Sequence, residues 1–324
     1  MKKLQDDLAS YGLGDALVAL LVRFQQGQLS AEMTLMYWLM LGHKVEEVEV
    51  CLGALEKAAM VGLSTAEPSF LSLHTMLAVN REGCQRIADM LASGVDSDRS
   101  ATSVEEGIAF CRRLFDWSVQ QSPEASVALY SLGNPVLLTA ATQEIVAWLR
   151  GQDLLGQERD ALDIGCGIGR FEEALSPVMR TITGIDVSPA MVKEAQRRCE
   201  KLTNVRVLEC EGRDLARFAD ASFDLVLAVD SFPYLFRSGW PLLARHFQES
   251  ARVLRPGGRL AVLDLSYGRT VELDRADFAR LAQEAALQVI EPGAQPFEHW
   301  DGWAFLACKT RSTATEAIEM SNCW

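Results

Sequence analysis

The sequence predicts an α/β protein in which an all-helical N-terminal domain precedes a domain built on a mostly parallel sheet. Over residues 1–125, apolar side chains keep a helical spacing almost throughout. From about residue 160 onward, short apolar segments alternate with helical ones, the pattern of a parallel sheet with helices on both faces. The length of 324 residues also favours two domains.

The N-terminal domain, residues 1–125, is expected to consist of helices only. Ser30 is expected to cap one of them, and Ser103-Val104-Glu105-Glu106 matches the capping box of another. No catalytic pattern occurs here, so we expect a lid, a substrate-shaping cap or a dimerisation surface. The expected helices cover 4–26, 31–41, 44–60, 69–91 (with a break near Asn80 or Gly83) and 104–121.

The second domain, residues 126–310, is expected to alternate between strands and helices. Its strands are expected at 161–164, 181–185, 205–209, 224–228, 259–264, 287–291 and 303–309. Its helices are expected at 136–150, 170–176, 189–201, 240–254 and 274–286. The tail, residues 311–324, is polar with little pattern, so we expect it to be disordered.

The turn after the first strand is the feature around which this domain is organised. Gly165, Gly167 and Gly169 follow the apolar end of that strand, and a helix begins at once. Backbone N–H groups at such a turn point at whatever lies above it, and glycine lets a ligand approach them closely. A dinucleotide-binding G-x-G-x-x-G fingerprint would need glycine where Arg170 stands, which speaks against a nicotinamide dehydrogenase.

The second strand ends in an acid. Asp186 closes the apolar segment 181–185, and Ser188 and Pro189 then open a helix as its cap and first-turn proline. A carboxylate at this strand end is placed to accept hydrogen bonds from both hydroxyls of a ribose. Together with the glycine turn, it predicts a site for a nucleoside.

From Tyr130 to Lys309 the sequence resembles the class I S-adenosylmethionine (SAM)-dependent methyltransferases. Beside the glycine turn and Asp186, four further segments resemble those of the family and stand in the expected order: Glu209–Leu215, Ser222–Asp230, Glu249–Leu260 with its Pro-Gly-Gly turn, and Gly302–Lys309. The resemblance implies a Rossmann-like, seven-stranded, mostly parallel sheet whose last strand is antiparallel.

The resemblance also implies which residues hold SAM. Asp214 and an adjacent backbone amide would read adenine, and the residues after the fourth strand would lie under the methionine end. Tyr130 and Asn134 belong to a segment that folds over the cofactor in this family; the alternative is a linker with a structural tyrosine. The implied cofactor-binding residues are Tyr130, Asn134, Asp163, Gly165, Cys166, Gly167, Gly169, Asp186, Val187, Met191, Arg213, Asp214, Leu215, Val229, Asp230 and Ser231.

Aromatic side chains are expected where the strands end. Residues after parallel strands share one rim of the sheet, and an antiparallel last strand begins on that rim. Aromatic faces attract a cation such as the sulfonium of SAM by about 0.5–2 kcal/mol each when desolvated. The aromatic candidates are Tyr130, Phe232, Tyr234, Tyr267, Trp300 and Trp303.

Catalysis in such a site mainly requires alignment of two reactants and exclusion of water, with a general base where the acceptor arrives protonated. Asp230 and His299 are the first candidates for that base, and Tyr267 is the next. Tyr130 and Tyr234 complete the set of candidate catalytic residues. The alternatives are structural: Asp230 would bind the amino group of the cofactor, and His299 would cap a turn.

The amino-acid composition limits which kinds of substrate, metal or membrane partner the protein is expected to have. A formal net charge of -13 argues against a nucleic-acid substrate. The 8 cysteines lack zinc-site spacing, so we expect no metal and reduced thiols in a cytoplasmic protein. The residues after Met1 do not resemble a signal peptide, and the apolar runs are too short to span a bilayer. We therefore expect a small-molecule substrate, no membrane, and a homodimer through the N-terminal helices.

Four functions follow as alternatives. The first is a SAM-dependent methyltransferase acting on a small metabolite, in secondary metabolism. The second is a SAM-consuming cyclase like the azetidine-2-carboxylate synthases, in which the amine of SAM attacks its own chain and methylthioadenosine leaves. The third is a non-catalytic SAM-binding subunit, and the fourth is a nicotinamide dehydrogenase. The segment Asp230–Tyr234 lacks the Asn-Pro-Pro-Tyr signature of amino-methylating enzymes, and the sequence lacks a catechol-type metal-binding acid pair, so the acceptor is not identified.

Overall fold

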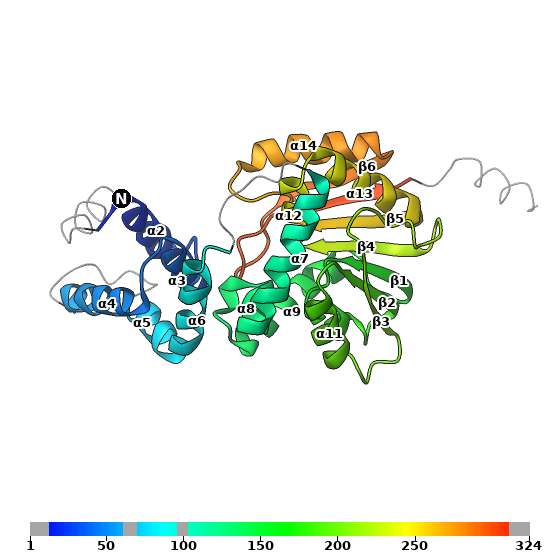
Figure 1. Cartoon of the computed structure of the whole chain (residues 1–324). Coiled ribbons are helices and arrows are strands. Elements are labelled where there is room, and N and C mark those ends of the chain that lie inside the picture. Colours follow the sequence, from blue (N-terminus) through cyan, green and yellow to red (C-terminus); the bar gives the residue numbers. More distant parts are fainter. Residues whose placement is uncertain (1–12, 61–69, 96–102, 311–324) are drawn as a thin grey trace, which may run out of the picture. The chain divides into compact units, whose positions relative to one another are not determined.

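A computed structural model describes residues 13–60, 70–95 and 103–310 (Figure 1). The chain divides into two compact units, each discontinuous in sequence. The helical unit contains the chain up to residue 98 together with 117–144 and 297–301, and the sheet unit contains 99–116, 145–296 and the chain from 302 onward. The division therefore differs from the boundary near residue 125 that the sequence pattern indicates.

The helical unit begins, within the described residues, with α2 at Asp15. Ser30 caps α3 as expected, accepting a hydrogen bond from the Met33 N–H at 3.3 Å. The expected break in the fourth helical stretch lies at Asn80, between α5 and α6. The helices of the unit are α2 (Asp15–Gln25), α3 (Ala31–Met40), α4 (Val45–Met60), α5 (Phe70–Val79), α6 (Arg81–Ala92) and α8 (Pro123–Val127), followed by η1 (Leu129–Ser131) and the start of α9 (Pro135–Gly151).

A loop from late in the sequence, residues 297–301, completes the helical unit. Trp300 is buried, and its ring lies 5.3 Å from Phe297 and 6.2 Å from Tyr130. The His299 imidazole pairs with the Glu32 carboxylate at 2.7 Å. These contacts explain why five residues near the C-terminus cluster with helices near the N-terminus.

The sheet unit holds a seven-stranded sheet of order β3-β2-β1-β4-β5-β7-β6 (Figure 1). The pairs among β1 to β5 are parallel, and β7 runs antiparallel to both neighbours, which confirms the expected topology. The strands are β1 (Gly156–Ile164), β2 (Met179–Asp186), β3 (Val205–Glu209), β4 (Phe223–Val229), β5 (Leu254–Leu263), β6 (Leu287–Ala294) and β7 (Ala304–Lys309).

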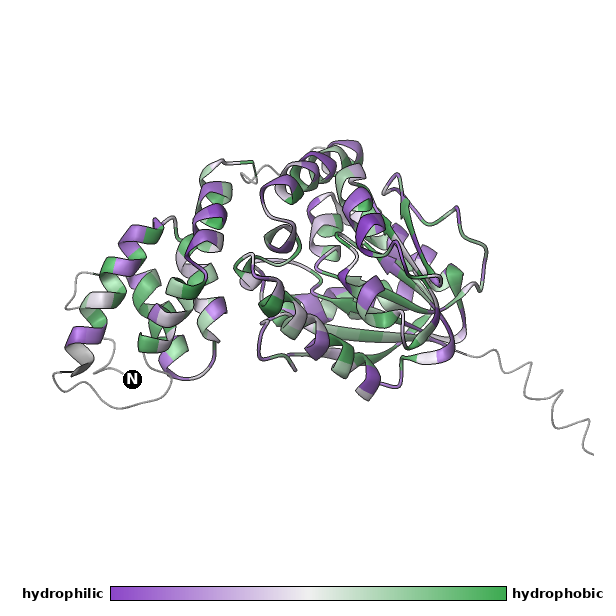
Figure 2. Ribbon diagram, turned by 90° about the horizontal axis from the view of Figure 1, so that it is seen from below, coloured by the Kyte–Doolittle hydropathy of each residue, from purple (hydrophilic) through white to green (hydrophobic). Residues whose placement is uncertain are grey.

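Helices cover both faces of this sheet. The largest core cluster joins strand residues such as Val226 and Leu260 to Phe247 and Phe278, which lie on α13 (Trp240–Val253) and α14 (Val271–Glu284). On α10 (Arg170–Leu175) and α11 (Pro189–Arg198), the buried residues face β2 and β3. In Figure 2 the central strands are coloured as hydrophobic and the helices carry hydrophilic segments.

Two differences from the expected elements have physical causes. β5 begins at Leu254 rather than near 259, because the segment Pro256-Gly257 stays in the strand and a register shift between Phe223 and Leu225 of β4 absorbs it. A short helix that the pattern did not indicate, α12 (Phe232–Arg237), follows β4 with Pro233 in its first turn.

In the middle of β1, Asp160 forms the centre of an ion-pair network. Its carboxylate accepts hydrogen bonds from Arg180 Nε at 2.8 Å, from Arg255 Nη2 at 2.9 Å and from the Thr181 hydroxyl at 2.7 Å. Only 8% of Asp160 is exposed. The hydrogen bond from Arg180 is the main reason why the pKa of Asp160 lies well below its usual range.

The Asp160→Asn variant is expected to lose about 1–3 kcal/mol of unfolding free energy at pH 7, because a buried carboxylate that accepts from Arg180, Arg255 and Thr181 loses its charge; Arg255 keeps a second partner in Asp224. Because the folded pKa of Asp160 is depressed, its contribution exists above the pKa of the unfolded state, near 4, and fades as the pH falls further. Denaturant unfolding at pH 7 measures the loss. Equal stabilities of the variant and the parent at pH 7 would contradict the assignment.

Within the described ranges, every helix is either too short or too polar to cross a bilayer.

Candidate cofactor and acceptor site

The glycine turn connects β1 to α10 at the carboxyl edge of the sheet. Gly165, Gly167 and Gly169 all have positive φ, at 78°, 53° and 82°, a backbone region that side chains disfavour. A Cβ on Gly165 would also lie 2.5 Å from the Cβ of Ser231 in the loop after β4. Glycine is therefore required both by the backbone conformation and by the close approach of the neighbouring loop.

Asp186, at the end of β2, holds this turn in place. Its Oδ2 accepts a hydrogen bond from the Gly167 N–H at 3.0 Å, and its Oδ1 accepts one from the Ser188 N–H at 2.8 Å. Burial raises the pKa of Asp186 to about 6, against the effect of these backbone donors. Each carboxylate oxygen has a second lone pair, so the group can also accept hydrogen bonds from a ligand above the turn.

The adenine side of the expected site lies beside Asp186, after β3. Leu215 and Met191 are fully buried, and the side chain of Val187 packs on Gly212. Arg213 and Asp214 have polar partners already. Arg213 pairs with Glu105 at 3.0 Å, and Asp214 accepts a hydrogen bond from the Ala216 N–H at 3.0 Å, the largest of the effects that lower its pKa.

The expected acceptor side lies after β4 and β5. The Tyr267 hydroxyl donates a hydrogen bond to Asp230 Oδ1 at 2.9 Å. The Tyr234 ring lies edge-on to Tyr267 at 5.9 Å and to Phe115 at 4.9 Å. Asp230 directly follows β4 with φ of 55°, and Asp264 directly follows β5 with φ of 64°. Asp264 Oδ1 accepts a hydrogen bond from the Trp303 N–H at 2.7 Å.

The pKa of Tyr267 distinguishes the two candidate bases in this group, Asp230 and Tyr267. Tyr267 is 46% exposed as a whole, but burial of its hydroxyl, followed by the nearby Asp230 carboxylate, raises the pKa of Tyr267 above its usual range. Tyr267 therefore keeps its proton at neutral pH and acts as a donor, which favours Asp230 over Tyr267 as the proton acceptor.

Beneath the glycine turn lies a buried acidic pair, Asp163 and Glu172. Within the described part of the chain, none of their four carboxyl oxygens has a hydrogen-bond partner. Burial raises the pKa of Asp163 to about 7, a shift that Arg170 opposes. Burial, and then the charge of Asp163, raises the pKa of Glu172 well above its usual range. Both carboxyl groups therefore hold a proton more strongly than an exposed carboxyl group does.

Removing the Glu172 carboxyl is expected to flatten the pH dependence of folding. A carboxyl whose folded pKa is raised binds more protons in the folded state, so stability falls as the pH rises above the unfolded pKa, by up to about 1.4 kcal/mol per pH unit. The parent should lose stability between pH 5 and pH 8, and Glu172→Gln should lose less. Glu173→Gln, one residue along and exposed, is the control. Parallel slopes for the parent and Glu172→Gln in denaturant unfolding would contradict this.

Comparison with known proteins addresses the same region. A family model described as "Methyltransferase domain" matches residues 162–262. A demethylmenaquinone methyltransferase of Tropheryma whipplei is 34% identical over 110 residues, which cover 34% of this chain and 43% of that protein. An O-methyltransferase of Aspergillus nomiae is 36% identical over 132 residues, which cover 40% of this chain and 53% of that protein. The chain thus matches about half, or less, of the length of these curated relatives.

A solved structure supports the fold. The phosphoethanolamine N-methyltransferase 1 of Haemonchus contortus, in complex with phosphoethanolamine and S-adenosylhomocysteine, aligns with a TM-score of 0.51 at 12% identity, over 68% of this chain and 54% of that one. The sheet unit therefore has the Rossmann-like fold of the class I SAM-dependent methyltransferases, and its residues 162–262 match a methyltransferase domain.

Three of the expected site residues form their contacts within the helical unit. Tyr130 is buried beside Trp300, Asn134 donates a hydrogen bond to Asn80 at 2.7 Å, and His299 pairs with Glu32. The Glu32 carboxylate raises the pKa of His299. Their roles in the methyltransferase site stay predictions.

Phe232 was expected on the aromatic rim, and this is wrong. Its side chain is fully buried in the core of the methyltransferase domain, with its ring 5.6 Å from that of Phe247. Phe232 is the first residue of α12, and its side chain belongs to the same core cluster as Val226, Leu260 and Phe247.

The structure adds residues to the site that the sequence pattern did not indicate. Ile108, Arg112, Phe115 and Asp116 of α7 (Val104–Gln121) contact the loops after β2, β3 and β4. The capping box at Ser103 did predict the helix, and the Glu106 N–H donates to the Ser103 hydroxyl at 3.2 Å. No sequence signal shows which surface such a helix covers.

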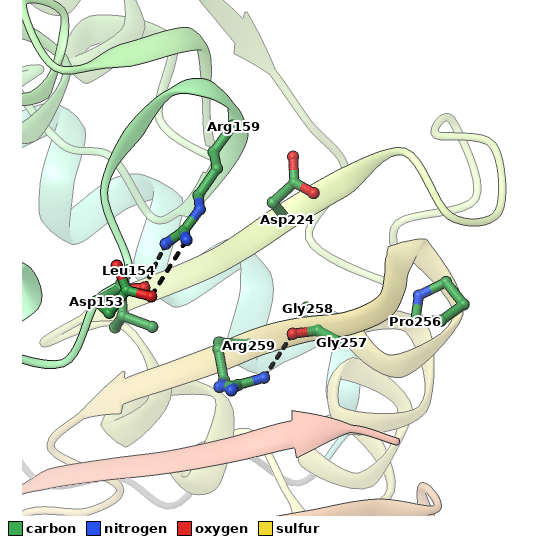
Figure 3. Close-up of a pocket in the computed structure, with 8 residues that line it drawn as sticks. All are labelled: Asp153, Leu154, Arg159, Asp224, Pro256, Gly257, Gly258 and Arg259. Carbon is green, nitrogen blue, oxygen red and sulfur yellow. Dashed lines mark hydrogen bonds and ion pairs between the residues drawn. The ribbon is translucent and has the colours of Figure 1, made fainter. Parts of the chain in front are cut away.

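One cavity lies away from this site (Figure 3). It has a volume of about 280 Å³ and lies at the amino-terminal halves of β1, β4 and β5, where Arg159 binds Asp153 and Arg259 binds the Gly257 carbonyl. In this fold, ligands bind at the carboxyl ends of the strands, so we do not assign the cavity to the reaction. Among the residues that the structure describes, no cluster of His, Cys, Asp or Glu could hold a metal ion.

Proposed function

We propose that this protein is a SAM-dependent methyltransferase that acts on a small molecule. The observation that carries the proposal is the contact of Asp186 with the Gly167 N–H, which joins a ribose-type carboxylate to a positive-φ glycine turn at the carboxyl edge of the sheet. In the proposed complex, Asp186 binds the ribose hydroxyls, Val187 and Leu215 flank adenine, and the turn lies against the methionine portion.

We also propose that the acceptor is a small molecule with an ionisable hydroxyl, in secondary metabolism. The matched relatives include an O-methyltransferase and a demethylmenaquinone methyltransferase, and the acceptor side offers the rings of Phe115, Tyr234 and Tyr267 beside Asp230. Asp230 would take the proton of the acceptor while SAM supplies the methyl group. Tyr267 would hold the Asp230 carboxylate in place.

A second candidate uses the same residues. The aromatic rings around Asp230 would equally suit a cyclase in which the amine of SAM loses a proton to Asp230 and attacks its own chain. The products would be azetidine-2-carboxylate and methylthioadenosine, without any acceptor.

One experiment separates the candidates. The protein is incubated with SAM alone and with a panel of phenolic, quinol and amine acceptors, and the nucleoside products are identified by mass spectrometry. S-adenosylhomocysteine that forms only with an acceptor supports the methyltransferase. Methylthioadenosine without an acceptor supports the cyclase, and binding without any product supports a non-catalytic subunit.

A cytoplasmic location and a homodimer through the helical unit belong to the proposal as well. The cysteines of the described ranges form no disulfide, which accords with a reducing compartment. Light scattering after size exclusion tests the dimer: a monomer mass at micromolar concentration would contradict it.

A further inference from the structure

A single helix touches three of the four segments that would surround the cofactor, those after β2, β3 and β4. The first thirteen residues of α7, 104–116, belong to the sheet unit, and Figure 1 shows this helix running across the edge of the sheet at which β4 ends. They contact the segment after β2 at 187–190, the segment after β3 at 209–213 and α12 after β4.

The contacts at the β2 and β3 loops are polar. Arg112 Nε donates to the Val187 carbonyl at 2.9 Å, and its Nη2 pairs with Glu209 at 3.0 Å. Asp116 Oδ1 accepts hydrogen bonds from the Ser188 hydroxyl at 2.6 Å and from the Ala190 N–H at 3.1 Å, at the start of α11. A carboxylate is favourable at this end of a helix because it faces unpaired N–H groups.

The side of α7 that faces the sheet is apolar and closely packed. Ile108 and Phe115 are seven residues apart and therefore lie on one face of the helix, Ile108 against Gly212 and Phe115 against Tyr234. Gly107 has no room for a side chain, because a Cβ there would lie 2.5 Å from the Cβ of Ser238. The helix is thus fitted against the mouth of the site along its length.

We propose that residues 104–116 form a strap that closes the cofactor site and must lift for SAM to enter and for the nucleoside product to leave. Arg112 and Asp116 are its latches, and Ile108 adds a wall to the adenine side. The inference rests on the proposed function, since it presumes that an adenosyl group occupies this edge. The Arg112–Glu209 pair has side-chain exposures of 42% and 48%, and exposed pairs are weak, so the latch can open without unfolding.

The experiment follows the binding and release of S-adenosylhomocysteine by stopped-flow fluorescence in the full-length protein. Arg112→Met removes the charge and both latch contacts but keeps the side-chain length, and Glu209→Gln breaks the same pair from the other side. Arg113→Met is the control, since Arg113 is exposed on the same helix. Melting temperatures establish that each variant is folded.

A strap that must lift for the ligand to enter and leave has a distinct effect on the binding kinetics. Both the association and dissociation rates should rise, by about three- to ten-fold in Arg112→Met and by less in Glu209→Gln, so that the Kd changes less than either rate. Raising the ionic strength should speed exchange in the parent and in Arg113→Met but not in Arg112→Met.

Two results would overturn the proposed strap. The first is that the association and dissociation rates of Arg112→Met equal those of Arg113→Met. The second is a faster dissociation from Arg112→Met with an unchanged association rate, which would mean that α7 contributes to affinity but does not control access. Failure of the proposed function looks different, because then the parent itself would bind no S-adenosylhomocysteine.

Discussion

Replacing Asp186 with alanine is expected to weaken the binding of SAM and S-adenosylhomocysteine by at least about 100-fold. Two losses combine. The ribose hydroxyls lose a charged acceptor, and hydrogen bonds to charged groups contribute about 1.5–3 kcal/mol each. The Gly167 and Ser188 N–H groups lose their acceptor too, so the glycine turn is no longer held in its binding conformation.

Calorimetric titration of the parent and the variant measures this effect. Glu211→Ala is a suitable control, because Glu211 is an exposed carboxylate on the neighbouring loop. The affinity of Asp186→Asn should lie between that of the parent and that of Asp186→Ala, since an amide oxygen still accepts hydrogen bonds but carries no charge. An Asp186→Ala protein that is folded and binds like the parent would exclude a ribose-binding role for this carboxylate.

The second large effect is expected at Asp230, where Asp230→Asn should lower kcat by about 10²–10⁴-fold, the usual contribution of a general base. Affinity for S-adenosylhomocysteine should change far less, because the nucleoside contacts are made elsewhere. The pKa of Tyr267 should fall in this variant, since the Asp230 carboxylate is one of the causes that raise it.

Steady-state rates with the acceptor found in the product screen measure the loss, and a spectrophotometric titration of tyrosine follows Tyr267. Tyr267→Phe keeps the carboxylate and should lose less activity than Asp230→Asn, because Tyr267 only positions the base. Full turnover in Asp230→Asn would rule out proton transfer to this residue. A loss of S-adenosylhomocysteine affinity as large as the loss of kcat would instead assign Asp230 to cofactor binding.

The sheet and the nucleoside end of the site could be predicted from the sequence because local rules determine them. A buried strand, a glycine turn and a helix follow one another within a few residues around Gly167, and parallel strands bring Asp186 to the same edge. The seven-stranded, mostly parallel sheet with an antiparallel last strand followed from the family resemblance and was confirmed.

Other features depend on contacts between residues far apart in the sequence. The capping box at Ser103 predicts a helix, but only the fold brings Arg112 within 3.0 Å of Glu209, 97 residues later. Likewise, no local pattern assigns the loop 297–301 to the helical unit, where it pairs with Glu32. Asp230, with its positive φ, and the buried Phe232 lie where β4 leads into α12, a helix that the sequence pattern did not predict.

The measurement that tests the central claim most directly is a calorimetric titration of the full-length protein with S-adenosylhomocysteine at pH 7.5. The account predicts saturable heat with one site per chain in the parent and in Glu211→Ala, and no measurable heat in folded Asp186→Ala. A folded parent protein that gives no heat with either S-adenosylhomocysteine or SAM would contradict it.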